Sequence, residues 1–518
     1  MPSFSAWIER AGNWRLRRKS PSIGAFHVLP ERGDSSPPRG AMPSQERRPS
    51  LLALHSETND RRTDVSCVPP DSYFRLAVVQ LIPQAHAVHQ TTSPIQGPAG
   101  SSPRRDWQRG FWWLMATQFQ NAFSDNALKN LVVLLVLANL AREAQETYVA
   151  LAGALFATPF LVFSMFGGWL ADRFSKARVM RTVKLAEIAI MIFASVALGL
   201  RNLPMELASI FLMGTHSAVF GPSKYGILPE ILPFERLSWG NGLLELLTFL
   251  GIILGTTAGG YLAEYMGKAQ YLSGLMLATL AIAGYGMSRG ITRVPAANPG
   301  CPPRLNPITD LWRQLQFLRR DRDLWRANWG NTGFWFVAAL VQMNLLIYAK
   351  EVLHLSESRN GLLNTALSIG IGVGSAVAGL VSRGRIQYGL VPLGAAGLAL
   401  STVPMGFDGL TTAWFCVCLV TLGLGAGFYI VPIAAVLQHR PPPESKGAVQ
   451  GAANLLSFVG VFTASAAQMF LGRVCHLRPG QVFWVCGAIV LAIGFYAVAT
   501  RREALRELFA GPTTVPVR

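Results

Sequence analysis

Charged residues inside otherwise apolar segments are the features of this sequence best suited to chemistry. Asp125 and Lys129 stand four residues apart in one such segment, and Lys224 and Glu245 lie in two others. A charge at the centre of a membrane-spanning helix costs about 2.5–3.5 kcal/mol on insertion scales, so it is kept there for pairing or for function. These residues therefore predict a polar binding or coupling site inside a membrane.

Two interpretations of Asp125 remain open. Helical spacing places Asp125 and Lys129 on one face, where the two charges can simply neutralise each other. Alternatively Asp125, which is flanked by Asn121 and Asn126, lines a central cavity and either binds a cationic group or titrates during coupling. The second interpretation makes Asp125, Asn126 and Lys129 candidate site residues.

Lys224 and Tyr225 follow Pro222, a residue that removes a backbone hydrogen bond and kinks a helix. An ammonium held at such a kink suits a phosphate group. The alternative is that Lys224 is the partner of Asp125 or Glu245. Glu245 itself is either a cavity contact or a contact between helices, and Asn241, one turn earlier, joins the candidate site.

Other polar residues in apolar segments are weaker candidates. Lys184 and Glu187 fall near the predicted end of their segment, where long side chains that reach the membrane surface explain them. Gln342, Asn344 and His439 are also weaker candidates, and a lone histidine at a helix end is usually structural. The six cysteines have no metal-ligand spacing, so we expect no metal, cofactor or catalytic site.

Composition places these charges in an integral membrane protein. Apolar residues make up 51% of the 518 residues and charged residues 14%, and the net charge is +18. Basic loops explain this charge better than nucleic-acid binding does. About 20 apolar residues span a bilayer, which predicts an all-α protein of twelve transmembrane helices near 111–140, 147–171, 179–200, 206–229, 239–265, 269–288, 327–350, 360–382, 386–406, 410–438, 447–472 and 480–500.

The twelve segments form two related halves. Asn241–Gly251 aligns with Gln450–Gly460 at a shift of 209, and Gly168 and Asp172 align with Gly379 and Arg383 at a shift of 211. Two six-helix repeats, joined by a basic linker, form the layout of the major facilitator superfamily. The predicted domains are a disordered basic tail or misassigned start (1–106), a first half (107–290), a cytoplasmic linker with an interfacial helix (291–326), a second half (327–500) and a C-terminal tail (501–518).

The loops support one orientation. With both termini in the cytoplasm, the cytoplasmic loops carry more than twice as many Lys and Arg residues as the opposite loops. In the linker, Leu311, Leu315 and Leu318 share one helical face among several arginines, which is typical of a helix at a membrane surface.

The loop after the second segment carries the sequence GWLADRFSKAR (Gly168–Arg178). It resembles the superfamily signature G-x-x-x-D-R-x-G-R-R, except that Ser175 and Ala177 replace a Gly and a basic residue. The predicted gating residues, whose ion pairs would open during alternating access, are Gly168, Asp172, Arg173, Lys176 and Arg178.

Four segments resemble one family closely. They are NAFSDNALKN (121–130), ADRFSKARVM (171–180), GPSKYGILPE (221–230) and 241–264. All resemble the bacterial lysophospholipid transporters, which flip lysophospholipids, especially 2-acyl-glycerophosphoethanolamine, across the cytoplasmic membrane for reacylation. The resemblance implies an inner-membrane location and an acyltransferase or acyl-carrier-protein synthetase as partner. For such a substrate, Asp125 would contact the ethanolammonium group and Lys224 would contact the phosphate. The uncharged second half would hold the acyl chain.

Two other functions remain open. One is a proton-coupled exporter of amphipathic small molecules in the same superfamily, and the other is a non-transporting scaffold for a lipid acyltransferase. The sequence does not indicate an enzyme, because the one acyltransferase-like pattern, His55–Asp60, lies in a polar tail too short for that fold.

Overall fold

The computed structural model describes residues 106–303, 306–355, 357–407 and 409–500. Within these ranges, the regular structure consists of α-helices and two short 3-10 turns, Phe234–Arg236 and Pro443–Ser445. Both predicted tails lie outside the described residues, except for Asp106. The all-α fold predicted from the sequence is therefore confirmed for this part of the chain.

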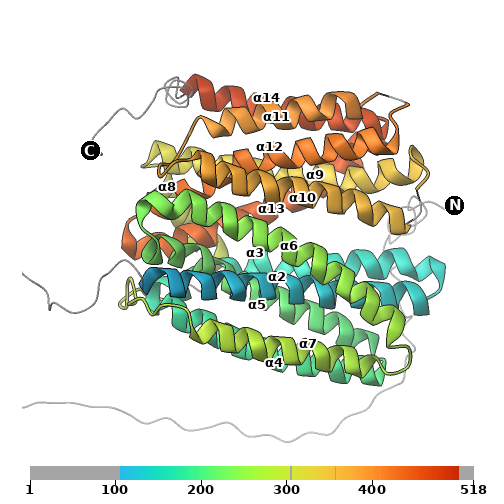
Figure 1. Ribbon diagram of the computed structural model, residues 1–518, viewed down its shortest axis with the longest axis horizontal. Coiled ribbons are helices and arrows are strands. Elements are labelled where there is room, and N and C mark those ends of the chain that lie inside the picture. Colours follow the sequence, from blue (N-terminus) through green and yellow to red (C-terminus); the bar gives the residue numbers. More distant parts are fainter. Residues whose placement is uncertain (1–105, 304–305, 356, 408, 501–518) are drawn as a thin grey trace, which may run out of the picture. The chain divides into compact units, whose positions relative to one another are not determined.

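Each predicted span corresponds to one helix (Figure 1). The first half contains α2 (Asp106–Asn139), α3 (Arg142–Arg173), α4 (Lys176–Leu200), α5 (Leu203–Ile231), α6 (Leu237–Tyr265) and α7 (Gln270–Arg289). The second half contains α9 (Arg322–Glu351), α10 (Glu357–Val381), α11 (Leu390–Met405), α12 (Thr412–His439), α13 (Lys446–Arg473) and α14 (Pro479–Thr500). A further helix, α8 (Pro307–Leu318), lies in the linker between the halves.

Ten of the described helices are long and apolar enough to cross a membrane. α11 has 16 residues, which is short for a span, and α2 carries a run of polar side chains between Gln118 and Asn130. The protein is a multi-pass membrane protein, and the count of twelve crossings stays a prediction.

Capping side chains mark several helix starts. The side chain of Asn202 accepts a hydrogen bond from the backbone N–H of Met205, and that of Asn306 accepts from Ile308 and Thr309. Proline follows within the first turn at both places, where its missing N–H removes no helical hydrogen bond. The sequence therefore specifies these boundaries locally.

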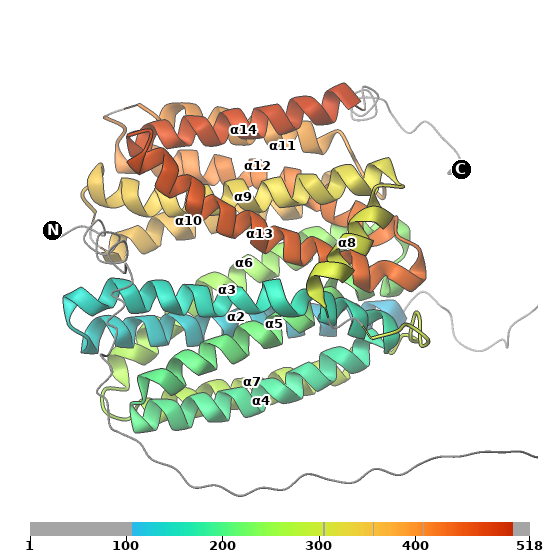
Figure 2. The same cartoon turned by 180° about the vertical axis from the view of Figure 1, so that it is seen from behind.

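The two halves share one pattern of helix packing (Figures 1 and 2). In the first half α2 packs on α6, α3 on α5 and α4 on α7. In the second half the corresponding pairs are α9 with α13, α10 with α12 and α11 with α14. The internal repeat detected in the sequence is thus a repeat in three dimensions.

Two seams join the halves, α3 against α13 and α6 against α10. A Cβ atom on Gly451 would collide with the carbonyl oxygen of Ser164 in the first seam, and one on Gly242 would collide with that of Ser375 in the second. Gly242 and Gly451 are related by the shift of 209, and the two serines by the shift of 211. The same contact is therefore built twice, because small residues let helix backbones approach closely.

Both seams lie near one end of the bundle, which we call the linker end because α8 lies there (Figure 2). The first seam runs from the stacked rings of Phe160 and Phe458, whose centroids are 3.9 Å apart, to Asp172 near the end of α3. The second seam involves Ser238 to Leu246, at the start of α6. Contact between the halves thus seals the linker end.

In the linker, where the sequence predicts a surface-bound helix, the structure has the helix α8, whose leucines pack against other helices. Leu318 is fully buried, and Leu311 packs on Met165 of α3 and on Ala452 and Leu455 of α13. The leucine face therefore rests on protein, where a surface-bound helix would turn it toward lipid. Ile308 and Trp312, which are 78% and 59% exposed, point outward instead.

Candidate functional site

Buried polar side chains from α2, α4 and α5 form a connected network inside the first half. The ammonium of Lys184 donates hydrogen bonds to Gln120 Oε1 at 2.7 Å, Asn121 Oδ1 at 2.9 Å and Glu187 Oε2 at 2.5 Å. The side chains of Lys184 and Glu187 are fully buried. Our expectation that these two side chains reach the membrane surface is therefore wrong, because they point into the bundle.

Asp125 lies at the other side of this network. Ser217 Oγ donates a hydrogen bond to Asp125 Oδ2 at 2.7 Å, and Asn121 Nδ2 donates to the same oxygen at 3.1 Å. His216 Nε2 lies 3.4 Å from Glu187 Oε2. The second carboxylate oxygen of Asp125, Oδ1, accepts no hydrogen bond within the described residues. Asp125 thus keeps one buried acceptor unpaired in this structure.

Asn126 and Lys129 do not join this network. Asn126 donates to the carbonyl of Ala122 on its own helix at 2.8 Å, and the ammonium of Lys129 lies 5.1 Å from the ring centroid of Phe156. Among the residues described, no ion pair within 4 Å connects Lys129 to Asp125. Any neutralisation of Asp125 by Lys129 therefore acts over more than 4 Å.

A second cluster connects α5 to α6. Tyr225 donates its hydroxyl proton to Glu245 Oε1 at 3.1 Å, and the ammonium of Lys224 lies 4.3 Å from the centroid of the Tyr225 ring. Lys224 and Glu245 are 9% and 6% exposed. Of the predicted site residues, Lys224, Tyr225 and Glu245 therefore form one cluster, whereas Asp125 belongs to the network of α2, α4 and α5.

Asn241 belongs to the contact between the halves. Its side-chain amide forms a reciprocal pair with that of Gln438 on α12, with hydrogen bonds of 2.9 and 2.7 Å. Asn454, which aligns with Glu245 in the repeat, donates to Ser164 across the first seam at 2.9 Å. Both amides hold helices together.

The predicted gating residues meet at the linker end. Asp172 accepts hydrogen bonds from the backbone N–H groups of Gly447, at 2.6 Å, and Ala448, at 2.9 Å, which are the first free donors of α13. A carboxylate at a helix N-terminus satisfies these donors and complements the helix dipole. Gly168 packs directly against the backbone of Gly447.

The basic residues of this loop have separate partners. Arg173 donates to the carbonyl of Cys301 in the linker at 2.6 Å, and buried Lys176 pairs with Glu230 on α5 at 2.6 Å. Arg178 is exposed to solvent. Of the five predicted residues, Asp172 and Gly168 contact the opposite half, whereas Arg173 and Lys176 fasten the first half and the linker.

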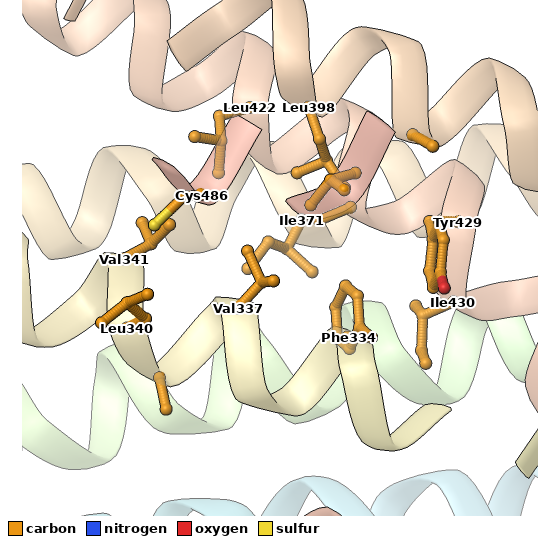
Figure 3. Packing of buried hydrophobic residues seen from close by; sticks show 14 of the residues in the cluster. Phe334, Val337, Leu340, Val341, Ile371, Leu398, Leu422, Tyr429, Ile430 and Cys486 are labelled. Carbon is orange, nitrogen blue, oxygen red and sulfur yellow. The ribbon is translucent and has the colours of Figure 1, made fainter. Parts of the chain in front are cut away.

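The spans of the second half carry no charged side chain in their interiors, as the sequence predicts, although amides such as Asn331 are buried there. Phe334 stacks on Tyr429 with ring centroids 5.6 Å apart, and Val337, Val341 and Ile371 continue the same packing (Figure 3). A cavity of about 110 Å³ lies among these side chains and reaches Phe249 of α6 and Gln342. Of the weaker candidates, Asn344 donates to the carbonyl of Pro479 at 2.7 Å, and the His439 ring packs at a tilt against Phe234, with the ring centroids 4.4 Å apart.

Three members of the buried network were missed from the sequence. They are Gln120, His216 and Ser217. Their signal was present, because Gln120 and Asn121 precede Asp125 by about one helical turn and His216–Ser217 interrupts an apolar helix. In the described part of the chain, no group of three or more His, Cys, Asp or Glu side chains is placed to hold a metal ion.

Comparison with known proteins decides the family. A profile of the Major Facilitator Superfamily matches residues 114–465, about two thirds of the chain. The chain belongs to this superfamily. Its match to a superfamily of transporters identifies a transporter rather than an enzyme, as the sequence predicted.

Solved structures of other superfamily members share the fold. The human organic anion transporter MFSD10 has a TM-score of 0.63 at 14% identity, and the Escherichia coli fucose:proton symporter FucP has 0.61 at 14%. Each comparison covers 76% of this chain and 99% of the other. At this identity the likeness concerns the superfamily fold alone.

Among curated proteins, the chain is similar to lysophospholipid transporters named LplT. It is 28% identical over 375 residues to the protein of Enterobacter sp. strain 638, which covers 71% of this chain and 88% of the relative. It is also 28% identical over 372 residues to the protein of Salmonella typhimurium strain LT2, which covers 71% and 87%. The resemblance to this family that the sequence indicated is confirmed.

Proposed function

We propose that this superfamily member transports lysophospholipids by alternating access. The similarity to LplT proteins over almost their whole length carries this proposal. The distribution of charge supports it: intramembrane charges cluster in the first half, and the spans of the second half have none in their interiors. A lysophospholipid has the same division, with a charged headgroup and one acyl chain.

The two clusters of the first half match the two charges of a phosphoethanolamine headgroup. In this proposal Asp125 receives the ethanolammonium through Oδ1, the oxygen that accepts no protein hydrogen bond. Lys224 receives the phosphate, because its ammonium is held over the Tyr225 ring and not in a close ion pair. Charge-assisted hydrogen bonds of this kind are stronger than neutral ones.

The acyl chain would occupy the second half. The cavity beside Phe334, Val337 and Ile371 is lined mainly by apolar side chains and reaches Phe249 of the first half. A chain placed there extends from the polar clusters into apolar surroundings. The cavity of about 110 Å³ is smaller than most ligand sites, so this step includes widening as the halves move.

The closed linker end supports the conformational part of the proposal. We place this end in the cytoplasm of a bacterium, with both termini there, because the basic loops cluster at it. The residues Gly168 and Asp172 would then close the cytoplasmic side while the far side admits substrate. The transported lipid would be reacylated by an acyltransferase or acyl-carrier-protein synthetase acting as partner.

Inward flipping of a fluorescent lysophosphatidylethanolamine into proteoliposomes that contain the full chain tests this proposal. We expect Asp125→Asn and Lys224→Ala each to reduce flux by about tenfold or more, the effect of losing a hydrogen bond to a charged group. Glu264→Gln and Lys268→Ala change exposed residues at the far end and should leave flux unchanged.

The outcomes separate the alternatives. Lysolipid-independent, proton-driven movement of amphipathic small molecules would replace the proposal with a drug exporter. Absence of any flux from folded wild-type protein, with or without a proton or sodium gradient, would indicate a scaffold.

A further inference from the structure

A second apolar cavity between helices of the second half adjoins the smaller one, with which it shares Tyr429 and Ile493. It measures about 380 Å³ and lies among α9, α11, α12 and α14, lined by Ala327, Gly330, Ile433, Ala492 and Ala497 among others. This volume is within the range of small-molecule sites in proteins. α11 and α14 pack on each other and on α12 and α9, so the cavity lies on the side of the second half away from the first.

The cavity opens toward the surroundings of the protein. Trp329 and Tyr496, which line it, are 45% and 54% exposed, and Ala492 is exposed as well. On a membrane-spanning bundle, such exposed apolar surface faces lipid. Trp and Tyr are also the residues enriched where membrane meets water. An acyl chain of the bilayer can therefore enter the cavity from the side.

The mouth of the cavity is basic and lies at the linker end. Arg326 and Asp323 line it in the first turns of α9, and exposed Arg322 precedes Arg326 by four residues, on the same helical face. Asp323 is shared between Arg440 Nη1 at 3.1 Å and Arg326 Nη1 at 3.4 Å. Arg440 also pairs with Asp321 at 2.6 Å, so three arginines (Arg322, Arg326 and Arg440) face two carboxylates, and the mouth keeps an excess of one positive charge.

We propose that this cavity binds an anionic diacyl phospholipid of the surrounding leaflet. One acyl chain lies in the cavity between α9 and α14, and the phosphate lies at Arg322 and Arg326. Basic pockets between transmembrane helices bind anionic headgroups by the same combination of charge and apolar contact. The site is separate from the Asp125 and Lys224 clusters, so it does not depend on the proposed transport function.

Photo-crosslinking tests the site. Full-length protein is reconstituted with phosphatidylglycerol or phosphatidylcholine that carries a diazirine in one acyl chain, and labelled peptides are mapped by mass spectrometry. We expect phosphatidylglycerol to label the peptides around Ala327 and Ala497 about fivefold more than phosphatidylcholine does. The substitution Arg326→Gln should reduce the labelling by phosphatidylglycerol about fivefold.

Matched variants separate a specific site from general lipid contact. Ala492→Phe fills the cavity from an exposed position and should abolish the labelling, whereas Ala189→Phe, at an exposed position on α4, should not. Arg109→Gln, an exposed arginine at the start of α2, is the control for Arg326→Gln. Equal labelling by both lipids, or labelling spread over all outward helices, would overturn the proposal.

Discussion

The two seams share a close glycine contact but differ in the hydrogen bonds that stabilise them. Gly451 meets Ser164 in one seam just as Gly242 meets Ser375 in the other, so duplication preserved the close approach. In the first seam Asp172 also accepts two hydrogen bonds from the start of α13. Its counterpart in the repeat is Arg383, a cation, which cannot accept them. The shared contact therefore sets how the halves fit, and the carboxylate adds stability to one seam alone.

The largest expected effect comes from a change that breaks what the seams share. Gly451→Val and Gly242→Val each place a Cβ where a carbonyl oxygen lies. Overpacking of this kind costs about 1–3 kcal/mol, and we expect both variants to shift the protein toward an open linker end. Spin labels at exposed residues 178 and 444, in a background without native cysteines, measure the shift as a longer distance. An unchanged distance in both variants would contradict the seam description.

Asp172→Asn tests what the seams do not share. The variant loses the charge-assisted hydrogen bonds to Gly447 and Ala448, and we expect the closed linker end to lose about 1.5–3 kcal/mol. The same spin-label pair reports the change. Arg383→Gln, the matched substitution in the second seam, should change the free energy of the closed linker end by less than about 0.5 kcal/mol. The distance between the spin labels should therefore stay nearly the same. Equal effects of the two substitutions would show that Asp172 stabilises its seam no more than Arg383 stabilises the other.

The amide pair beside the second seam provides a smaller effect. Asn241→Leu leaves Gln438 buried without its partner, and Gln438→Leu does the same to Asn241. Hydrogen bonds between membrane helices contribute about 0.6 kcal/mol on average, so the double variant should be destabilised by about that amount. Each single variant should be less stable than the double one, because one buried amide is left unsatisfied. Thermal unfolding in detergent measures all three.

The smallest effect lies outside both seams, where Arg440 joins the end of α12 to the start of α9. Burial acts to raise the pKa of Asp321, but the hydrogen bond from Arg440 at 2.6 Å and two backbone N–H groups hold that pKa below its usual value. Because Arg440 is partly exposed, Arg440→Gln should cost about 1 kcal/mol or less.

The pH dependence of that difference has a definite sign. A lowered folded-state pKa stabilises the protein above the unfolded value of about 3.9, and the stabilisation is lost as the pH falls through the lowered pKa. The difference in stability between wild type and Arg440→Gln should therefore be constant between about pH 7 and pH 5. Below about pH 4 the two stabilities should converge. Thermal unfolding across this range checks it, and convergence at neutral pH would exclude the role of Asp321.

The parts of this molecule that the sequence predicted are those governed by local pattern. Apolar runs located the helices, and the shifts of 209 and 211 located glycines and serines that prove to be the seam contacts. The side-chain network could not be derived in this way. Whether Lys184 points to the surface or to Gln120 depends on how α4 is rotated against α2, and that rotation is set by packing between helices.

Partners far apart in sequence were equally inaccessible. The bond between Asp172 and Gly447 crosses 275 positions, and nothing in either local sequence identifies the other. Asp172 was selected from its motif for an ion pair, and the structure adds two backbone N–H donors of α13. A sequence motif located the residue without revealing the chemistry of its contact.

The position of Leu311 gives the linker a mechanical role. This leucine packs against a cluster formed by Met165 of one half and by Ala452 and Leu455 of the other. The surface that buries it therefore exists only while the linker end is closed. If the halves separate there during transport, α8 must leave at least one of these surfaces. The connection between the halves would then have to detach during the cycle, although Leu311 lies outside the proposed substrate site.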